Sequence, residues 1–358
     1  MLELSQVFDA FWDDFSEGLF IPEYIQKCIN DLCCCQTEYF GGDILACDNC
    51  GKEHFVYHSC KNRFCPKCYR KQQDKWIKER SSELLNCLYF HAVVTVPPQL
   101  HGVCRQHQKI VYGILMREAA AAMQKLCQDS KFLGADIGIM EVLHTWTRSQ
   151  LYHPHVHCLI PAGGLDKNNN WKVTRQSYLV PVKAWSDIFR EKVRVALKKE
   201  GLLRYVPKKA WTIRWVSYAK PSVQGTDKVL KYLARYVFKA PISNSNIVKI
   251  DKQKKQVTFR FCTSDKGWQV KTLSADKFIS RILQHILPRG FHKVRYYGFW
   301  SPSQKERLKR AVCLVGSHPI AAEKPCTTDM EPRECPFCKK GQLLHVKIMR
   351  SQKWRAPP

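Results

Sequence analysis

The sequence has few acidic residues and no long apolar run. Its 358 residues contain 31 Asp and Glu against 58 Lys and Arg, which gives a formal net charge of +27. No apolar stretch approaches the roughly 20 residues of a membrane-spanning helix, and the opening MLELSQVFDAFWDDF lacks the basic segment of a signal peptide. We therefore expect a cytoplasmic protein with no membrane partner. The basic excess predicts a polyanionic partner, and nucleic acid is favoured over an anionic membrane surface.

The sequence also lacks the G-x-x-x-x-G-K-[ST] loop that cradles nucleotide phosphates. This absence excludes a motor that uses such a loop to hydrolyse ATP. It contains no internal repeat and no low-complexity tract, so the chain is expected to fold around ordinary apolar cores.

Cysteine, in contrast, is abundant. With 18 cysteines and no export signal, the chain is expected to use thiols for metal binding in a reducing compartment. Cys47 and Cys50 form one C-x-x-C pair, and Cys65 and Cys68 form a second. Two such knuckles can complete a closed tetrahedral site, which predicts one structural Zn²⁺ bound by these four thiolates.

Other potential ligands lie near this cluster and near the C-terminus. Around the cluster, a ligand exchange or a second ion could involve Cys35, Cys60, His54 and His58. In the C-terminal segment a second zinc knuckle could use Cys335, Cys338, His345 and Cys326. Only one C-x-x-C is present there, so unliganded thiols in a solvated loop are an equal alternative.

Hydrophobic periodicity predicts an α+β fold, with an antiparallel sheet covered by helices. Helices are expected over 1–34, 69–88, 105–127, 183–199, 226–239 and 274–287. Strands are expected over 89–97, 138–146, 155–161, 211–219 and 292–300, with a hairpin over 246–261. The expected domains are a helical segment 1–34, a zinc domain and connecting helix 35–88, a catalytic domain 89–300, and a basic, less regular tail 301–358.

The segment YHPHVHCLIP places histidines at alternate positions of an expected strand. Residues i and i+2 share one face of a strand, so His155 and His157 present two imidazoles side by side. Two buried imidazoles need two sets of partners and are too few for a closed structural site, which indicates a catalytic divalent ion with open positions. His144 on the preceding strand is the expected third ligand, and the alternatives are Glu141, Gln150 and His153.

The segment KYLARYVFK places Tyr232 and Tyr236 one turn apart on an expected helix. Such a pair alone is most often an aromatic stripe that packs against a sheet. Beside a metal site in a very basic chain, a phenol can instead attack phosphorus and form a phosphotyrosine. Lys239 is then expected to neutralise developing charge, and Arg235 and Lys231 to contact DNA.

These motifs together resemble the HUH endonuclease superfamily, and more closely the two-tyrosine rolling-circle transposases of the insertion-sequence ninety-one type. The stretches that carry the resemblance span roughly residues 35 to 300. They are HSCKNRFCPKC, YFHAVVTVP, LYHPHVHCLIPAGGL with HTW before it, YLARY, and FISRILQHILPRGFHKVRYYGFW.

The resemblance implies a ferredoxin-like sheet with the histidines on a central strand and the tyrosines on a flanking helix. It implies that His155 and His157 bind Mg²⁺ or Mn²⁺ and that both tyrosines are nucleophiles. It further implies nicking and joining of single-stranded DNA at element ends and at a target, with 5′-phosphotyrosine intermediates. The zinc module would be an accessory DNA-binding domain whose family pattern includes Cys35 and Cys60. A host helicase or replication machinery would unwind the strands at the bacterial nucleoid.

Three other functions compete with this interpretation. A rolling-circle replication initiator or relaxase would use the same chemistry for a different purpose. A non-catalytic, zinc-dependent regulator would bind DNA and leave it intact. A zinc hydrolase would use the histidines, but it explains neither the charge nor the tyrosine pair.

Overall fold

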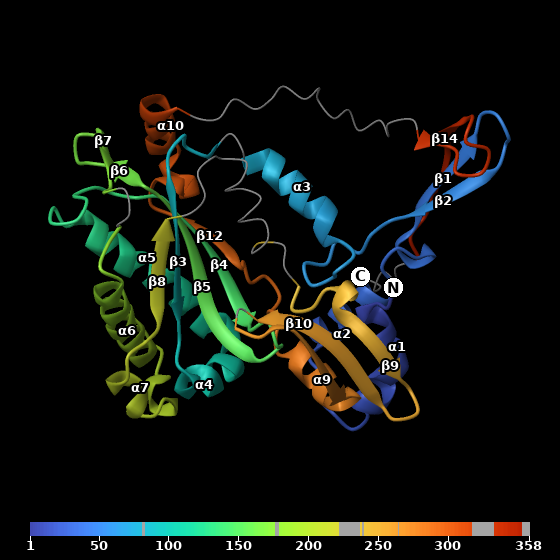
Figure 1. Cartoon of the computed structure of the whole chain (residues 1–358), viewed down its shortest axis with the longest axis horizontal. Coiled ribbons are helices and arrows are strands. Elements are labelled where there is room, and N and C mark those ends of the chain that lie inside the picture. The colour runs from blue at the N-terminus through green and yellow to red at the C-terminus, as the bar shows by residue number, and fades with distance from the viewer. Residues whose placement is uncertain are drawn as a thin grey trace, which may run out of the picture. The chain divides into compact units, whose positions relative to one another are not determined.

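A computed structural model describes residues 1–80, 83–175, 179–221, 237, 240–263, 265–316 and 333–352. The chain divides into two compact units (Figure 1). The first unit comprises 1–72, 242–279 and 320–358, and the second comprises 73–241 and 280–319. Within the described residues, no helix has the length and apolarity to cross a bilayer.

The second unit is built on a five-stranded antiparallel sheet (Figure 1). In spatial order its strands are β12 (Val294–Tyr297), β4 (Ile139–Trp146), β5 (Tyr152–Pro161), β3 (Tyr89–Thr95) and β8 (Ser217–Pro221). The three central strands are runs of apolar and β-branched residues that are almost wholly buried, as expected for strands with both faces covered. The α+β class and the strand predictions around the histidines are confirmed.

The two longest helices of this unit cover one face of the sheet. The long helices α5 (Gln108–Gln128) and α6 (Val182–Lys199) share an apolar core with Val156, Cys158 and Ile160 of β5. Because side chains alternate along a strand, the odd-numbered residues of β5 point to the opposite face. The sheet therefore separates a helix-covered core from the face that carries the histidines.

Shorter elements complete the second unit. They are η3 (Pro98–Leu100), α4 (His101–Gln106), β6 (Gly163–Leu165), β7 (Trp171–Val173), η4 (Leu203–Tyr205), α7 (Lys209–Thr212), η6 (Gly298–Trp300), η7 (Pro302–Gln304) and α10 (Lys305–Val315). Two helices, α3 (Tyr69–Arg80) and α9 (Ala275–Leu283), cross the boundary between the units.

Two predictions in this unit are wrong. The strand expected over 211–219 begins only at Ser217, because Trp215 turns inward and its Nε1 donates to the carbonyl of Ala210 at 2.8 Å. The described residues beyond 301 are largely regular: residues 305–315 form α10, and two strands form in the first unit.

The first unit combines helices with two small sheets. Its helices are α1 (Leu4–Ser16), α2 (Glu23–Cys33), η1 (Glu38–Phe40) and η5 (Asn244–Asn246). One sheet has the order β13 (Arg333–Glu334), β14 (Gln342–Met349), β1 (Gly42–Cys47) and β2 (Glu53–Tyr57). The other has the order β11 (Gly267–Ser274), β10 (Gln256–Thr263) and β9 (Ile247–Asp251), so the expected hairpin acquires a third strand.

This division differs from the expected catalytic domain 89–300, because residues 242–279 fold with the N-terminal helices. Asn244 Oδ1 accepts a hydrogen bond from the backbone N–H of Leu4 at 3.1 Å. Lys255, in the turn between β9 and β10, pairs with Asp14 of α1 at 2.6 Å. These contacts join parts of the chain that local periodicity gives no reason to connect.

Candidate active site and metal centres

Three histidines meet on the face of the central sheet that the long helices leave uncovered. Strand register places His144 of β4 directly opposite His155 of β5, and His157 lies two residues further along β5. One ring nitrogen from each lies within 4.8 Å of the others. His144 and His157 are buried, and His155 is partly exposed. The structure thus brings together the three residues that the sequence predicted as ligands.

A backbone contact determines the tautomer of His155. Its Nδ1 lies 2.7 Å from the carbonyl oxygen of His153. A carbonyl only accepts, so Nδ1 carries the proton and Nε2 presents its lone pair. His155 is therefore held in the form that a metal ligand requires.

His91 of β3 adds a fourth imidazole that the sequence reasoning did not single out. Its Nε2 lies 2.9 Å from Nδ1 of His157, and the two rings are stacked with centroids 5.2 Å apart. Burial lowers the pKa of His91 to about 4, so this ring is neutral at pH 7. The available signal was its location in YFHAVVTVP, at a position where a core strand rarely carries a histidine.

The other candidate ligands lie elsewhere. Glu141 is fully buried on the helix-covered face, where Cys158 Sγ donates to its Oε1 at 3.6 Å, and burial raises the pKa of Glu141 well above its usual range. The Nε2 of Gln150 donates to the carbonyl of Pro241. His153 contributes its carbonyl to His155. Among the candidate third ligands, His144 is the one that the structure groups with His155 and His157.

Aromatic rings flank the triad. Trp146 stacks on His144 with centroids 4.7 Å apart, and Tyr218 of β8 meets His91 edge-on at 5.7 Å. These rings limit the rotation of the imidazoles, as preorganised sites require.

Apart from Val237, the predicted tyrosine helix lies outside the described residues. This covers the expected nucleophiles, Tyr232 and Tyr236, and the expected basic residues, Lys231, Arg235 and Lys239. Their roles remain predictions from the sequence.

The first unit contains a cluster of four cysteines: Cys35, Cys60, Cys65 and Cys68. The Sγ of Cys68 lies 3.5 Å from those of Cys35 and Cys60. Four sulfurs at about 2.3 Å from one zinc ion are about 3.8 Å apart, so this spacing fits zinc and is too long for a disulfide. Hydrogen bonds from these neighbouring thiols, Cys35 first, lower the pKa of Cys68, which favours the thiolate.

Asn62 organises the loop of this cluster. It donates to buried Asp31 at 3.0 Å, and its Oδ1 accepts from the backbone N–H of Phe64 at 2.9 Å. Lys67, between the last two cysteines, pairs with Glu3 at 2.6 Å. The loop is thereby fixed to both N-terminal helices.

A second cluster holds the other predicted C-x-x-C cysteines, while the candidate ligand Cys326 lies outside the described residues. Cys47 and Cys50 lie with Cys335 and Cys338 of the C-terminal segment, again with all four sulfurs within 4.8 Å. Grouping Cys47 and Cys50 with Cys65 and Cys68 in one site was therefore wrong. The reason is the antiparallel pairing of β1 with β14, which brings the C-terminal knuckle to Cys47.

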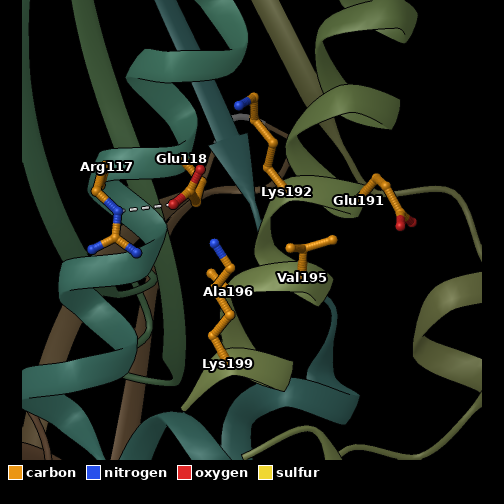
Figure 2. A pocket seen from close by; sticks show the side chains of 7 residues that line it. All are labelled: Arg117, Glu118, Glu191, Lys192, Val195, Ala196 and Lys199. Carbon is orange, nitrogen blue, oxygen red and sulfur yellow. Dashed lines mark hydrogen bonds and ion pairs between the residues drawn. The ribbon is translucent and has the colours of Figure 1, made fainter.

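A surface groove of about 460 Å³ lies between α5 and α6 (Figure 2). It is lined by Arg117, Glu118, Glu191, Lys192, Val195, Ala196 and Lys199. Arg117 pairs with Glu118 at 2.8 Å. Both helices cover the face of the sheet opposite to the histidines, so this groove is separate from the histidine site.

Comparisons with known proteins place this chain among transposases. Residues 138–307 match the model of a family described as "Putative transposase", and residues 7–96 match a "Transposase zinc-binding domain". The chain is 34% identical over 349 residues to "Putative transposase y4qJ" of Sinorhizobium fredii, covering 88% of this chain and 87% of the relative. It is 27% identical over 339 residues to the "Transposase for insertion sequence element IS801" of Pseudomonas savastanoi pv. phaseolicola, covering 87% and 80%. No solved structure matches.

The two family matches coincide with the two kinds of site. The zinc-binding model includes the first cysteine cluster, which accounts for structural zinc as a cofactor, and the transposase model includes the three histidines. The chain belongs to the transposases of the insertion-sequence ninety-one type, which carry an N-terminal zinc-binding domain.

Proposed function

We propose that this transposase nicks and rejoins single-stranded DNA at the ends of its insertion sequence through 5′-phosphotyrosine intermediates. The observation that carries the proposal is the histidine triad on the face of the sheet opposite to α5 and α6, in a chain of this family. The same chemistry would act on the target strand, in rolling-circle transposition. A host helicase or replication machinery would supply single strands at the bacterial nucleoid.

The triad suits a divalent cation, Mg²⁺ or Mn²⁺. His155 offers Nε2 because its Nδ1–H is used by the carbonyl of His153. His157 offers Nε2 when its Nδ1–H donates to His91. When bound, the ion supplies charge that polarises a non-bridging oxygen of the scissile phosphate. Three ligands leave coordination positions for the substrate, as a catalytic site requires.

The nucleophile would come from Tyr232 or Tyr236. The phenol gives up its proton to solvent as its oxygen forms a bond to phosphorus, the bond from phosphorus to the 3′-oxygen breaks, and the leaving 3′-oxygen takes a proton from solvent. Lys239 would neutralise charge developing on the phosphate, and Arg235 and Lys231 would contact the DNA backbone. Because the phosphodiester energy is kept in the phosphotyrosine, a free 3′-hydroxyl can reverse the step and join strands.

His91 would be a positioning residue. A ligating imidazole usually donates its other N–H to a second group, which fixes ring orientation and tautomer. His91 is placed to accept that bond from His157 within a buried setting. It would therefore act through His157 without touching the DNA.

In the first unit we propose that Cys35, Cys60, Cys65 and Cys68 hold the structural zinc. Their sulfur spacing fits a tetrahedral ion. This module would add contacts to DNA, helped by the net charge of +27.

A covalent adduct tests the catalytic proposal. The zinc-loaded protein is incubated with labelled single-stranded DNA from an element end and Mn²⁺, and the modified residue is mapped by mass spectrometry. We expect a DNA 5′-phosphate linked to Tyr232 or Tyr236. Intact DNA with no adduct would instead support a DNA-binding regulator. An adduct with an element end, and none with a plasmid replication origin, separates a transposase from a replication initiator.

A further inference from the structure

The second cysteine cluster is built from two matching knuckles at distant places in the sequence. Cys47 and Cys338 are 291 positions apart. In the first knuckle, the N–H of Gly51 donates to the carbonyl of Cys47 at 2.9 Å. In the second, the N–H of Lys339 donates to the carbonyl of Cys335, also at 2.9 Å. Gly51 and Lys339 both have positive φ, +67° and +55°. The two loops therefore have the same turn geometry.

Backbone amides in each knuckle point at sulfur. The N–H groups of Asn49 and Cys50 both lie 3.4 Å from the Sγ of Cys47. The N–H of Gly341 lies 3.4 Å from the Sγ of Cys338. Donors aimed at sulfur stabilise the charged thiolate, which is the form that binds metal.

The knuckles are also bonded to each other. Asp48 Oδ1 accepts from the N–H of Gln342 at 2.8 Å, and the N–H of Asp48 donates to the carbonyl of Gln342 at 3.1 Å. A Cβ added at Gly341 would lie 2.5 Å from both Cys47 Sγ and Asp48 Oδ1. The close approach of the two loops therefore depends on glycine at this position.

The sulfur spacing distinguishes zinc from a disulfide. Cys47 and Cys338 have sulfurs 3.6 Å apart, and those of Cys50 and Cys335 are 3.8 Å apart. A tetrahedral zinc–thiolate site gives about 3.8 Å, and a disulfide gives about 2.05 Å. We propose that Cys47, Cys50, Cys335 and Cys338 bind a second structural zinc ion that joins the C-terminal segment to the N-terminal hairpin. This ligand set extends beyond the zinc-binding match at 7–96.

The proposed ion would supply much of the stability of this four-stranded sheet. Its buried apolar cluster contains only Leu45 and Leu343 besides the cysteines Cys47 and Cys335. Several neighbouring side chains are exposed: Phe55, Phe337, Leu344, Val346 and Ile348. So small a core cannot offset the entropy of ordering two distant segments, and metal binding is the usual source of stability in such folds.

Zinc stoichiometry in the purified full-length chain tests the site. The background is His155→Ala with His157→Ala, so that the histidine triad adds no ion. We expect two zinc ions per chain by elemental mass spectrometry. Replacing Cys335 and Cys338 with Ser should remove one ion, while Cys313→Ser, at an exposed cysteine outside both clusters, should remove none. One ion in the parent chain, or two in the double Ser variant, would overturn the proposal.

A variant that keeps all four cysteines separates an effect on the zinc site from the misfolding that loss of a ligand could cause. Gly341→Ala should release one of the two ions to a chelator about tenfold faster or more, as outer-shell changes do. Gly102→Ala is the control, because a Cβ there meets no atom within 4 Å. His345 bonds to Asp43 at 3.3 Å instead of joining the cluster, so His345→Ala should keep both ions. Unchanged release from Gly341→Ala would count against the site, and so would zinc loss from His345→Ala.

Discussion

Replacing His91 with phenylalanine tests whether the buried imidazole controls metal binding. The change keeps an aromatic ring of similar size beside Tyr218 and His157 and removes the nitrogen that lies 2.9 Å from His157 Nδ1. In the proposed metal-bound state, His157 would use Nε2 for the ion, so its Nδ1–H would need an acceptor. In the variant that donor is buried without its partner.

The size of the effect follows from the cost of an unsatisfied buried donor, about 1–3 kcal/mol. Without metal, His157 can change tautomer, so most of this cost falls on the bound state. At about 1.4 kcal/mol per tenfold change, the Kd for Mn²⁺ should rise about 5- to 150-fold. His91→Gln places an amide oxygen near the lost nitrogen and should restore most of the affinity.

Calorimetric titration of zinc-loaded protein with Mn²⁺ measures this Kd directly, and urea unfolding checks that both variants keep the stability of the parent. The Mn²⁺ concentration that gives half-maximal nicking should rise in parallel, while nicking at saturating Mn²⁺ should recover. An unchanged Kd in a fully folded His91→Phe protein would refute the positioning role. Loss of nicking that saturating Mn²⁺ does not restore would indicate a role other than metal binding.

Three further outcomes are expected. His155→Ala or His157→Ala should reduce nicking of single-stranded DNA to background while leaving DNA affinity within about twofold, because phosphate contacts elsewhere supply the affinity; nicking that persists in EDTA would exclude the metal role. Tyr232→Phe and Tyr236→Phe should each block transposition in cells, and the double variant should form no covalent adduct with single-stranded DNA; an adduct in the double variant would place the nucleophile elsewhere. Burial lowers the pKa of His285 to about 3, below the unfolded value of about 6.5, so its contribution to stability is complete above pH 6.5 and is lost as the pH falls towards 3. At pH 5 that loss is about 2 kcal/mol. Urea unfolding should therefore show that the free energy of unfolding falls less between pH 7 and pH 5 in His285→Asn than in the unsubstituted protein. An equal fall in both proteins would contradict the argument.

The sequence predicted the histidine site because the relevant signals are local. The alternation of side chains along a strand puts His155 and His157 on the same face. The short connection between β4 and β5 favours a hairpin, which places His144 opposite His155. His91 was missed because its bond to His157 spans 66 residues and crosses between strands. The spacing of residues along one strand does not specify which strand pairs beside it in the sheet.

The cysteine grouping failed for a similar reason. C-x-x-C pairs predict that two thiolates converge, but they carry no information about which pairs share an ion. The pairing of β1 with β14, from opposite ends of the described chain, decided that question. The same limit hid the association of residues 242–279 with the N-terminal helices, since long-range contacts such as the ion pair of Lys255 with Asp14 leave no periodic signal.

The central position of β1 in its sheet has a consequence for synthesis of the protein. β1 is paired on one side by β2, which follows directly, and on the other by β14, near the far end of the described chain (Figure 1). At about 5–20 residues per second, the 291 positions between Cys47 and Cys338 correspond to about 15–60 s of translation. Throughout that interval β1 lacks its second partner and two thiols are unmatched, while the whole five-stranded sheet is being made. An open edge of this kind is prone to pair with other chains, so the hairpin is exposed to misassembly until β14 is made.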